Sequence, residues 1–289
     1  MDEIEEIEEI EEMEKLQNID CIEFLHKIDD ESIDLILTDP PYIISKDTGM
    51  NEHYKNVKNN ECTKTEEEWE SYKLNLKKPA SELKKDKGVG WSKENYIKYG
   101  SIYGKKYCVK TDYGEWDSEF TLDYLDKVVE FYYKKLRKGG TCIIWFDVWK
   151  ISELKNILEK HKFKQLRLIE WVKTNPQPIN SNVNYLTNCR EIAISAVKGG
   201  KPTFNSKYDK GIYEYPMAAG KNRFHPTQKN IKLFEDLIKK HSNENDNVLD
   251  TFLGSGTTAL ACKNTNRICF GCEINPEYYS RFTEFLDKE

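Results

Sequence analysis

Residues 248–258 read Val-Leu-Asp-Thr-Phe-Leu-Gly-Ser-Gly-Thr-Thr, an apolar stretch that runs into a glycine turn. The pattern predicts a buried strand over 247–250, followed by a turn that opens a helix. Glycines in such a turn let backbone N–H groups approach a ligand, and the start of the helix favours electronegative groups. Glu273 lies 17 residues after Gly256, at the end of the next predicted strand. A carboxylate there can accept hydrogen bonds from both hydroxyls of a ribose.

The glycine turn also excludes two classes of ligand. It lacks the third glycine of the dinucleotide-binding pattern and the lysine of a phosphate-binding loop, so NAD and ATP fit poorly. A glycine turn alone is weak evidence for a ligand site, because such turns join strands to helices in many proteins. The acid at 273 is what strengthens the prediction of a ligand site here. A nucleoside without a polyphosphate suits this site best.

A second motif, Asp39-Pro40-Pro41-Tyr42, directly follows the predicted buried strand 33–38. Consecutive prolines stiffen the backbone and contribute carbonyls without N–H groups of their own. The Asp39 carboxylate and the Pro40 carbonyl then become neighbouring acceptors beside the flat ring of Tyr42, which suits an exocyclic amino group on a stacked base. Asp-Pro and Pro-Pro are also ordinary turn dipeptides. The pairing with the glycine turn favours function.

The remaining pattern alternates strands and helices, which predicts an α/β fold with a mostly parallel sheet covered on both faces. The expected strands cover 33–38, 141–146, 166–172, 191–197, 247–250 and 267–272, and the expected helices 122–137, 151–160, 227–240 and a last one from 276.

Three stretches depart from this rhythm. Residues 1–18 form an acidic arm with an apolar residue at every third position, expected to be either a frayed extension or a helix that docks on a sister subunit or a basic surface. Residues 43–116 and 173–222 interrupt the catalytic domain, 19–289, and are irregular and polar. Insertions of this length are usually functional, so both are candidates for target recognition.

Composition limits the function classes. Of the 289 residues, 38% are hydrophobic and 33% charged, and no apolar run approaches the roughly 18 residues of a membrane span. The net charge is −6, but residues 1–14 hold nine acids and no base, which leaves 41 acidic against 44 basic residues, about +3, in the rest. A polyanionic partner is therefore compatible with the chain.

The eight cysteines are too sparse for a disulfide scaffold and predict reduced thiols, hence a cytoplasmic protein. Cys269 and Cys272 form one C-x-x-C, yet no second pair has zinc spacing. They are expected to be core thiols, and no metal is expected.

Together these motifs resemble the S-adenosylmethionine-dependent amino-methyltransferases of DNA, in the permuted order that places the catalytic tetrapeptide before the glycine motif. Asp39 precedes Asp250 by 211 residues, as that order requires. The closer resemblance is to the compact MboII-like type, and it is carried by segments 114–117, 171–178 and 224–229. The resemblance spans about residues 19–285. The long insertion and the acidic arm have no recognised counterpart there.

The resemblance implies a Rossmann-like methyltransferase sheet flanked by helices, S-adenosylmethionine as cofactor and a flipped adenine in double-stranded DNA as substrate. Asp-Pro-Pro-Tyr is typical of adenine-N6 enzymes. The implied catalytic residues are Asp39, Pro40, Pro41 and Tyr42. The implied cofactor-binding residues are Asp39, His225, Thr227, Lys229, Asp250, Phe252, Gly254, Ser255, Gly256, Thr257 and Glu273.

Several alternatives stay open. They are cytosine-N4 methylation, methylation of RNA or of a protein glutamine, and a silent nucleic-acid-binding module that keeps the fold. A homodimer and a cognate restriction endonuclease are further partners compatible with the resemblance, in a bacterial or phage-infected cell, with no membrane partner. The sequence assigns neither the recognition site nor the assembly.

Overall fold

The computed structural model describes residues 15–41, 63–74, 93–100, 120–176, 186, 188–217 and 228–286. By its internal contacts the chain divides into two units, residues 1–43 with 120–289, and residues 44–119. The first unit carries the whole sheet. None of its described helices, nor those of the second unit, is long and apolar enough to cross a membrane.

The first unit is built on an eight-stranded sheet in the order β1-β8-β7-β2-β3-β5-β4-β6. Only β5 runs antiparallel to its neighbours. The strands are β1 (Leu16–Gln17), β2 (Ile33–Thr38), β3 (Leu136–Phe146), β4 (Lys164–Lys173), β5 (Arg190–Val197), β6 (Ile212–Tyr215), β7 (Asn247–Asp250) and β8 (Ile268–Cys272). The predicted α/β class is confirmed.

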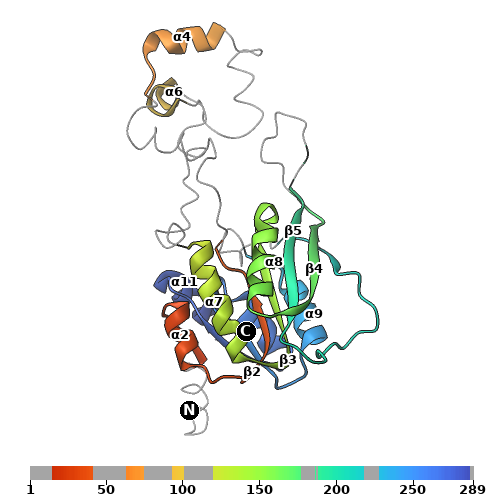
Figure 1. Cartoon of the computed structure of the whole chain (residues 1–289). Helices are drawn as coiled ribbons and strands as arrows, with labels where there is room; N and C mark the ends of the chain where they lie inside the picture. Colours follow the sequence, from red (N-terminus) through yellow and green to blue (C-terminus); the bar gives the residue numbers. More distant parts are fainter. Residues whose placement is uncertain are drawn as a thin grey trace. The chain divides into compact units, whose positions relative to one another are not determined.

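Helices cover both faces of this sheet (Figure 1). On one face lie α2 (Cys21–Lys27), α7 (Leu122–Lys135) and α8 (Ile151–Lys160), and on the other α9 (Ile231–His241) and α10 (Thr257–Asn264). The last helix, α11 (Pro276–Leu286), packs Phe282 against Leu253 and Ala259. Because each helix buries one apolar stripe, the sheet is shielded from water on both faces, as a parallel sheet requires.

Local chemistry sets the helix boundaries. The side chains of Asp20, Thr121 and Asn230 accept backbone N–H groups at the starts of α2, α7 and α9, contacts that contribute about 1 kcal/mol each. The predicted helix over 227–240 therefore begins later, at Ile231. The predicted helix over 122–137 ends at Lys135, and β3 starts at once at Leu136, so that it includes Gly139 and Gly140 ahead of the predicted strand 141–146.

The three stretches that depart from the strand–helix rhythm contain regular structure that the sequence did not predict. Leu16–Gln17, inside the range expected for the acidic arm, form a strand that pairs with β8. Ile212–Tyr215, inside 173–222, form β6 and pair with β4. The second unit contains α4 (Glu66–Leu74) and α6 (Lys93–Tyr99). Trp69, Tyr72 and Tyr96 pack together between these two helices. Periodicity missed the two helices because both are short and mostly polar.

Candidate active site

The candidate site lies where the direction of chain progression through the sheet reverses. From β7 the chain passes through α10 to β8 on one side, whereas from β2 it passes to β3 on the other. The carboxyl ends of these parallel strands share one edge, and ligands of open α/β sheets bind at such a reversal. Asp39, Asp250 and Glu273 follow or end three of these strands, so the topology brings the two sequence motifs together.

A buried hydrogen bond joins the two motifs. The Thr38 hydroxyl donates to the Asp250 carboxylate at 2.7 Å, and the Thr258 hydroxyl and the Phe252 N–H donate to the same carboxylate. Burial raises the pKa of Asp250 to about 6, despite these donors. Asp250 thus fixes the end of β2 and the start of the glycine turn relative to each other.

The glycine turn requires two left-handed residues, Gly254 at φ 51° and Gly256 at φ 72°. Gly256 is also the N-cap of α10, and a Cβ there would lie 2.8 Å from the Cβ of Phe282. Beside the turn the hydroxyls of Ser255 and Thr257 lie 3.1 Å apart. Close packing of α11 against this turn, together with the backbone conformation, therefore demands glycine at 256.

Glu273 is held by the backbone on both sides of its carboxylate. Its Oε2 accepts the Gly254 N–H and its Oε1 accepts the Asn275 N–H, each at 2.8 Å. The side chain is buried, and this burial raises the pKa of Glu273. Each carboxylate oxygen has a second lone pair. These remaining acceptor positions fit the two hydroxyl donors of a ribose.

Asp39 is partly buried at the end of β2 and forms an ion pair with Lys229, at 2.8 Å between Oδ2 and Nζ. Pro40 is buried and Pro41 half-buried. Lys229 was expected to contact a cofactor, and that role stays a prediction. Phe252 is half-buried and packs edge-on against Phe120, with ring centroids 5.4 Å apart. Tyr42, His225 and Thr227 lie outside the described residues.

Sequence reasoning missed two residues of this site. Thr38 is the last residue of a predicted strand, and only the position of β7 beside β2 shows that its hydroxyl binds Asp250. Glu191, whose carboxylate binds both Lys229 and Lys173, begins the apolar run Glu-Ile-Ala-Ile-Ser-Ala-Val. A charged residue at the start of a buried strand was the available signal for it.

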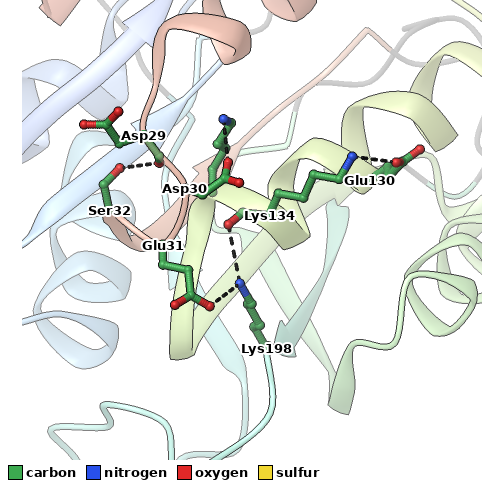
Figure 2. A network of polar contacts seen from close by, with 8 residues as sticks. Asp29, Asp30, Glu31, Ser32, Glu130, Lys134 and Lys198 are labelled. Atoms are coloured by element: carbon green, nitrogen blue, oxygen red, sulfur yellow. Dashed lines mark hydrogen bonds and ion pairs between the residues drawn. The ribbon is translucent and has the colours of Figure 1, made fainter.

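Within 173–222 the sequence offers polar and cationic groups for base reading, namely Lys173, Asn175, Asn180, Asn182, Asn184, Arg190, Lys198 and Lys201. Two of these residues lie at the edge of the sheet opposite Asp39. Lys198 follows the end of antiparallel β5 and binds Glu31 and the Lys134 carbonyl, as Figure 2 shows. The carbonyl of Lys201 lies beside Gly139, at the same edge. The eight residues of β5 span roughly 25 Å, so these two lysines lie far from Asp39, and their expected part in base reading is wrong for DNA bound at the carboxyl edge.

Three of the remaining residues of that set lie among the described residues, and each of them has a partner within the protein. Lys173 is partly buried and pairs with Glu191, and Asn175 accepts the Met217 N–H. Asn180, Asn182 and Asn184 lie outside the described residues. Arg190 lies at the carboxyl edge and binds Glu170 at 3.0 Å.

Cys269 and Cys272 lie three residues apart on β8, so their side chains point to opposite faces of the sheet. Cys272 is fully buried, and Cys269 packs among core residues. Burial raises the pKa of the Cys272 thiol well above its usual range. This geometry agrees with core thiols and cannot hold one metal ion between them.

Comparison with known proteins identifies the family of this site. The family model described as DNA methylase, for N6 and N4 methyltransferases, matches residues 33–284. The chain belongs to this family. As a member of the N6/N4 DNA methylase family it is a DNA methyltransferase that uses S-adenosylmethionine, which confirms the predicted family, enzyme class and cofactor.

Curated relatives of this DNA methylase are Type II methyltransferases. M.HpaI of Haemophilus parainfluenzae is 28% identical over 280 residues, which cover 93% of this chain and 72% of that protein. M2.MboI of Moraxella bovis is 28% identical over 276 residues, with 89% and 82% covered. M1.MboII of Moraxella bovis is 44% identical over 64 residues, which cover 22% of this chain and 25% of that protein.

Solved structures share the fold of this DNA methylase. The M1.HpyAVI complex with SAM has a TM-score of 0.59 at 25% identity and covers 94% of this chain and 98% of that one. The cytosine-N4-specific PvuII DNA methyltransferase has a TM-score of 0.60 at 16% identity, with 93% and 84% covered. At that identity the PvuII enzyme is informative about the fold alone.

Proposed function

We propose that this DNA methylase transfers the methyl group of S-adenosylmethionine to the N6 amino group of a flipped adenine within a specific DNA sequence. The observation that carries the proposal is the Thr38–Asp250 hydrogen bond, which sets Asp39 and Pro40 beside the glycine turn. The Asp-Pro-Pro-Tyr tetrapeptide, which resembles the form typical of adenine enzymes, supports adenine over cytosine.

Cofactor binding rests on the glycine turn and Glu273. The Glu273 carboxylate, already oriented by the Gly254 and Asn275 N–H groups, accepts the ribose hydroxyls with its remaining lone pairs. When bound, S-adenosylmethionine supplies an electrophilic methyl group on a sulfonium. The glycine turn brings backbone close to that ligand because there is open space beside Gly254, where a Cβ would have no heavy atom nearer than 3.9 Å.

Asp39 and Pro40 prepare the target nitrogen. The N6 lone pair of adenine is delocalised into the ring, which makes the nitrogen a poor nucleophile. Acceptors for its two hydrogens pull the nitrogen toward tetrahedral geometry and localise the lone pair, mainly through positioning and electrostatics. The base must leave the duplex to reach these groups, and Tyr42 is the residue expected to stack on it.

One labelling experiment distinguishes the proposed function from all of its rivals. The protein is incubated with methyl-labelled S-adenosylmethionine and mixed-sequence DNA, RNA or protein, and the products are digested to nucleosides or amino acids. Label in N6-methyldeoxyadenosine is the expected result. Label in N4-methyldeoxycytidine, in a ribonucleoside or in glutamine overturns the substrate assignment, and the absence of label with intact cofactor binding indicates a silent module.

Target recognition is assigned to parts of 43–116 and 173–222. The sheet and its motifs are committed to cofactor and target base, so base reading requires other polar and cationic segments. Within 173–222, the strands β5 and β6 belong to the sheet, so base reading in this range is assigned to residues 174–189, which connect β4 to β5 in the sequence. The names of the curated relatives support a place in the modification half of a restriction system.

A further inference from the structure

Four charged side chains form a continuous line at the carboxyl edge of the sheet. Lys173 at the end of β4 binds Glu191 near the start of β5, with 2.6 Å between Nζ and Oε1. The other Glu191 oxygen binds Lys229, and Lys229 binds Asp39 at 2.8 Å. The charges alternate in sign, so the line is neutral as a whole and ends on the residue proposed to receive the target base.

Lys229, which lies between Glu191 and Asp39 in this line, is almost completely buried, with 5% of its side chain exposed. Its ammonium lies 5.6 Å from the ring centroid of Trp145, which is fully buried and stacks on Phe234 of α9. A buried ammonium is tolerated only with close anionic partners. Glu191 and Asp39 supply two carboxylates on either side of it, while the indole face limits its movement.

The geometry points to Glu191 as a positioning residue that acts through Lys229 to orient the Asp39 carboxylate for methyl transfer, an inference that rests on the proposed function. Glu191 contacts neither target base nor cofactor in this scheme. It sets the place and the charge balance of the lysine that binds Asp39.

The reason is electrostatic. Shared between two carboxylates, the Lys229 ammonium neutralises neither completely, and Asp39 keeps the negative charge that makes it a strong acceptor. If Glu191 is neutral, the line carries a net charge of +1, and Lys229 turns toward Asp39 alone. Burial raises the pKa of Glu191, but the ammoniums of Lys229 and Lys173 outweigh it and hold that pKa below its usual range, so Glu191 is ionised at neutral pH.

The test compares Glu191→Gln, Lys229→Met and the double variant in single-turnover methylation of DNA, with S-adenosylmethionine affinity measured by calorimetry. Glu191→Gln is expected to slow methyl transfer about tenfold while the cofactor Kd changes by less than about twofold. If Glu191 acts through Lys229, the double variant should be no slower than Lys229→Met. Rates that multiply in the double variant, or a Glu191→Gln rate within about twofold of the wild type, overturn the inference.

Glu31→Gln is the matched control. It breaks the ion pair with Lys198 at the opposite edge of the sheet, shown in Figure 2, and should leave the methylation rate unchanged. A Glu31→Gln rate as low as that of Glu191→Gln overturns the inference, because loss of any ion pair would then suffice.

Asp39→Ala, measured in the same assay, separates the two proposals. Full activity in that variant overturns the proposed role of Asp39, whereas an inactive Asp39→Ala with an unaffected Glu191→Gln overturns only the positioning role. If Glu191→Gln does not fold, Glu191→Asp replaces it. That variant keeps the charge but withdraws the carboxylate by one methylene, and it should also slow transfer, so a rate like that of the wild type counts against the inference.

Discussion

The Thr38 hydroxyl and the Asp250 carboxylate, 212 residues apart in the chain, form a 2.7 Å hydrogen bond across the β2–β7 pair. This bond places the end of β2, where Asp39 begins, against the strand that opens the glycine turn. Because both residues are fully buried or nearly so, the bond is shielded from competing water and fixes one motif relative to the other.

Asp39→Ala should lower kcat for DNA methylation by at least about a hundredfold, since it removes an acceptor whose contribution is greatest in the transition state. Steady-state kinetics with labelled cofactor measures this loss. Lys229 retains Glu191 as a partner in the variant, so circular dichroism should show a folded protein. A folded variant with near-normal turnover would contradict the assignment.

Glu273→Gln should weaken S-adenosylmethionine binding about tenfold or more, because the ribose hydroxyls lose a charged acceptor in a buried site. The amide keeps the shape of the side chain and an oxygen for one of the two backbone N–H donors, while its NH2 group cannot accept the other. Isothermal titration calorimetry gives the Kd. Glu277→Gln changes an exposed acid four residues later in the chain that pairs with Arg281; this control should bind as the wild type does. Equal affinities for both variants would mean that another group holds the ribose.

Asp250→Asn should change how stability depends on pH. The pKa of Asp250 is raised from 3.8 to about 6 in the folded protein, so the folded state holds this proton more tightly than the unfolded chain does. The contribution of Asp250 is therefore most favourable below about pH 4 and declines as pH rises to about 6, by about 3 kcal/mol at most. The asparagine variant lacks this decline.

Chemical denaturation at several pH values between about 4 and 7 measures the effect. The unfolding free energy of Asp250→Asn, relative to that of the wild type, should increase across this range and level off above it. Parallel curves for the two proteins would show that the Asp250 carboxyl titrates normally.

Gly256→Ala should destabilise the fold by about 3 kcal/mol, since a methyl group adds both left-handed backbone strain and a clash with Phe282. Gly199→Ala is the matched control. Gly199 has a similar φ of 53° but no heavy atom within 4 Å of the Cβ position, so only the backbone strain applies, roughly 1 kcal/mol. Equal losses in urea denaturation would show that the contact with α11 contributes nothing.

Exchanging residues 174–189 for those of a related enzyme with another target should move the methylated sequence while cofactor affinity stays the same. The exchange leaves β4, β5 and β6 intact, so the sheet is preserved. Sequencing of methylated DNA identifies the site. If the original site persists, base reading lies in 43–116, and deletion of most of 46–110 should then abolish DNA binding but not cofactor binding.

The class of fold and the family could be predicted from the residues alone. Strand and helix periodicity placed the strands at 33–38, 191–197 and 247–250 within one residue of their observed bounds, because a strand that is covered by helices on both faces of the sheet needs a nearly continuous apolar run. The glycine turn and Glu273 were recognisable for a similar reason: a positive φ at a tight turn and a carboxylate at a strand end are local requirements, visible in the residues themselves.

The contacts between side chains from distant segments could not be predicted without the three-dimensional structure. One example is the hydrogen bond between Thr38 and Asp250, and another is the pair of ion pairs that Lys229 forms with Glu191 and Asp39. These residues belong to segments that are adjacent only because of the order of the strands in the sheet. The antiparallel direction of β5 put Glu191 at the active edge and Lys198 at the opposite one, although both flank the same apolar run. A strand's direction within a sheet is set by packing of the whole domain and not by its own residues, which is why the two ends of β5 could not be told apart in the sequence.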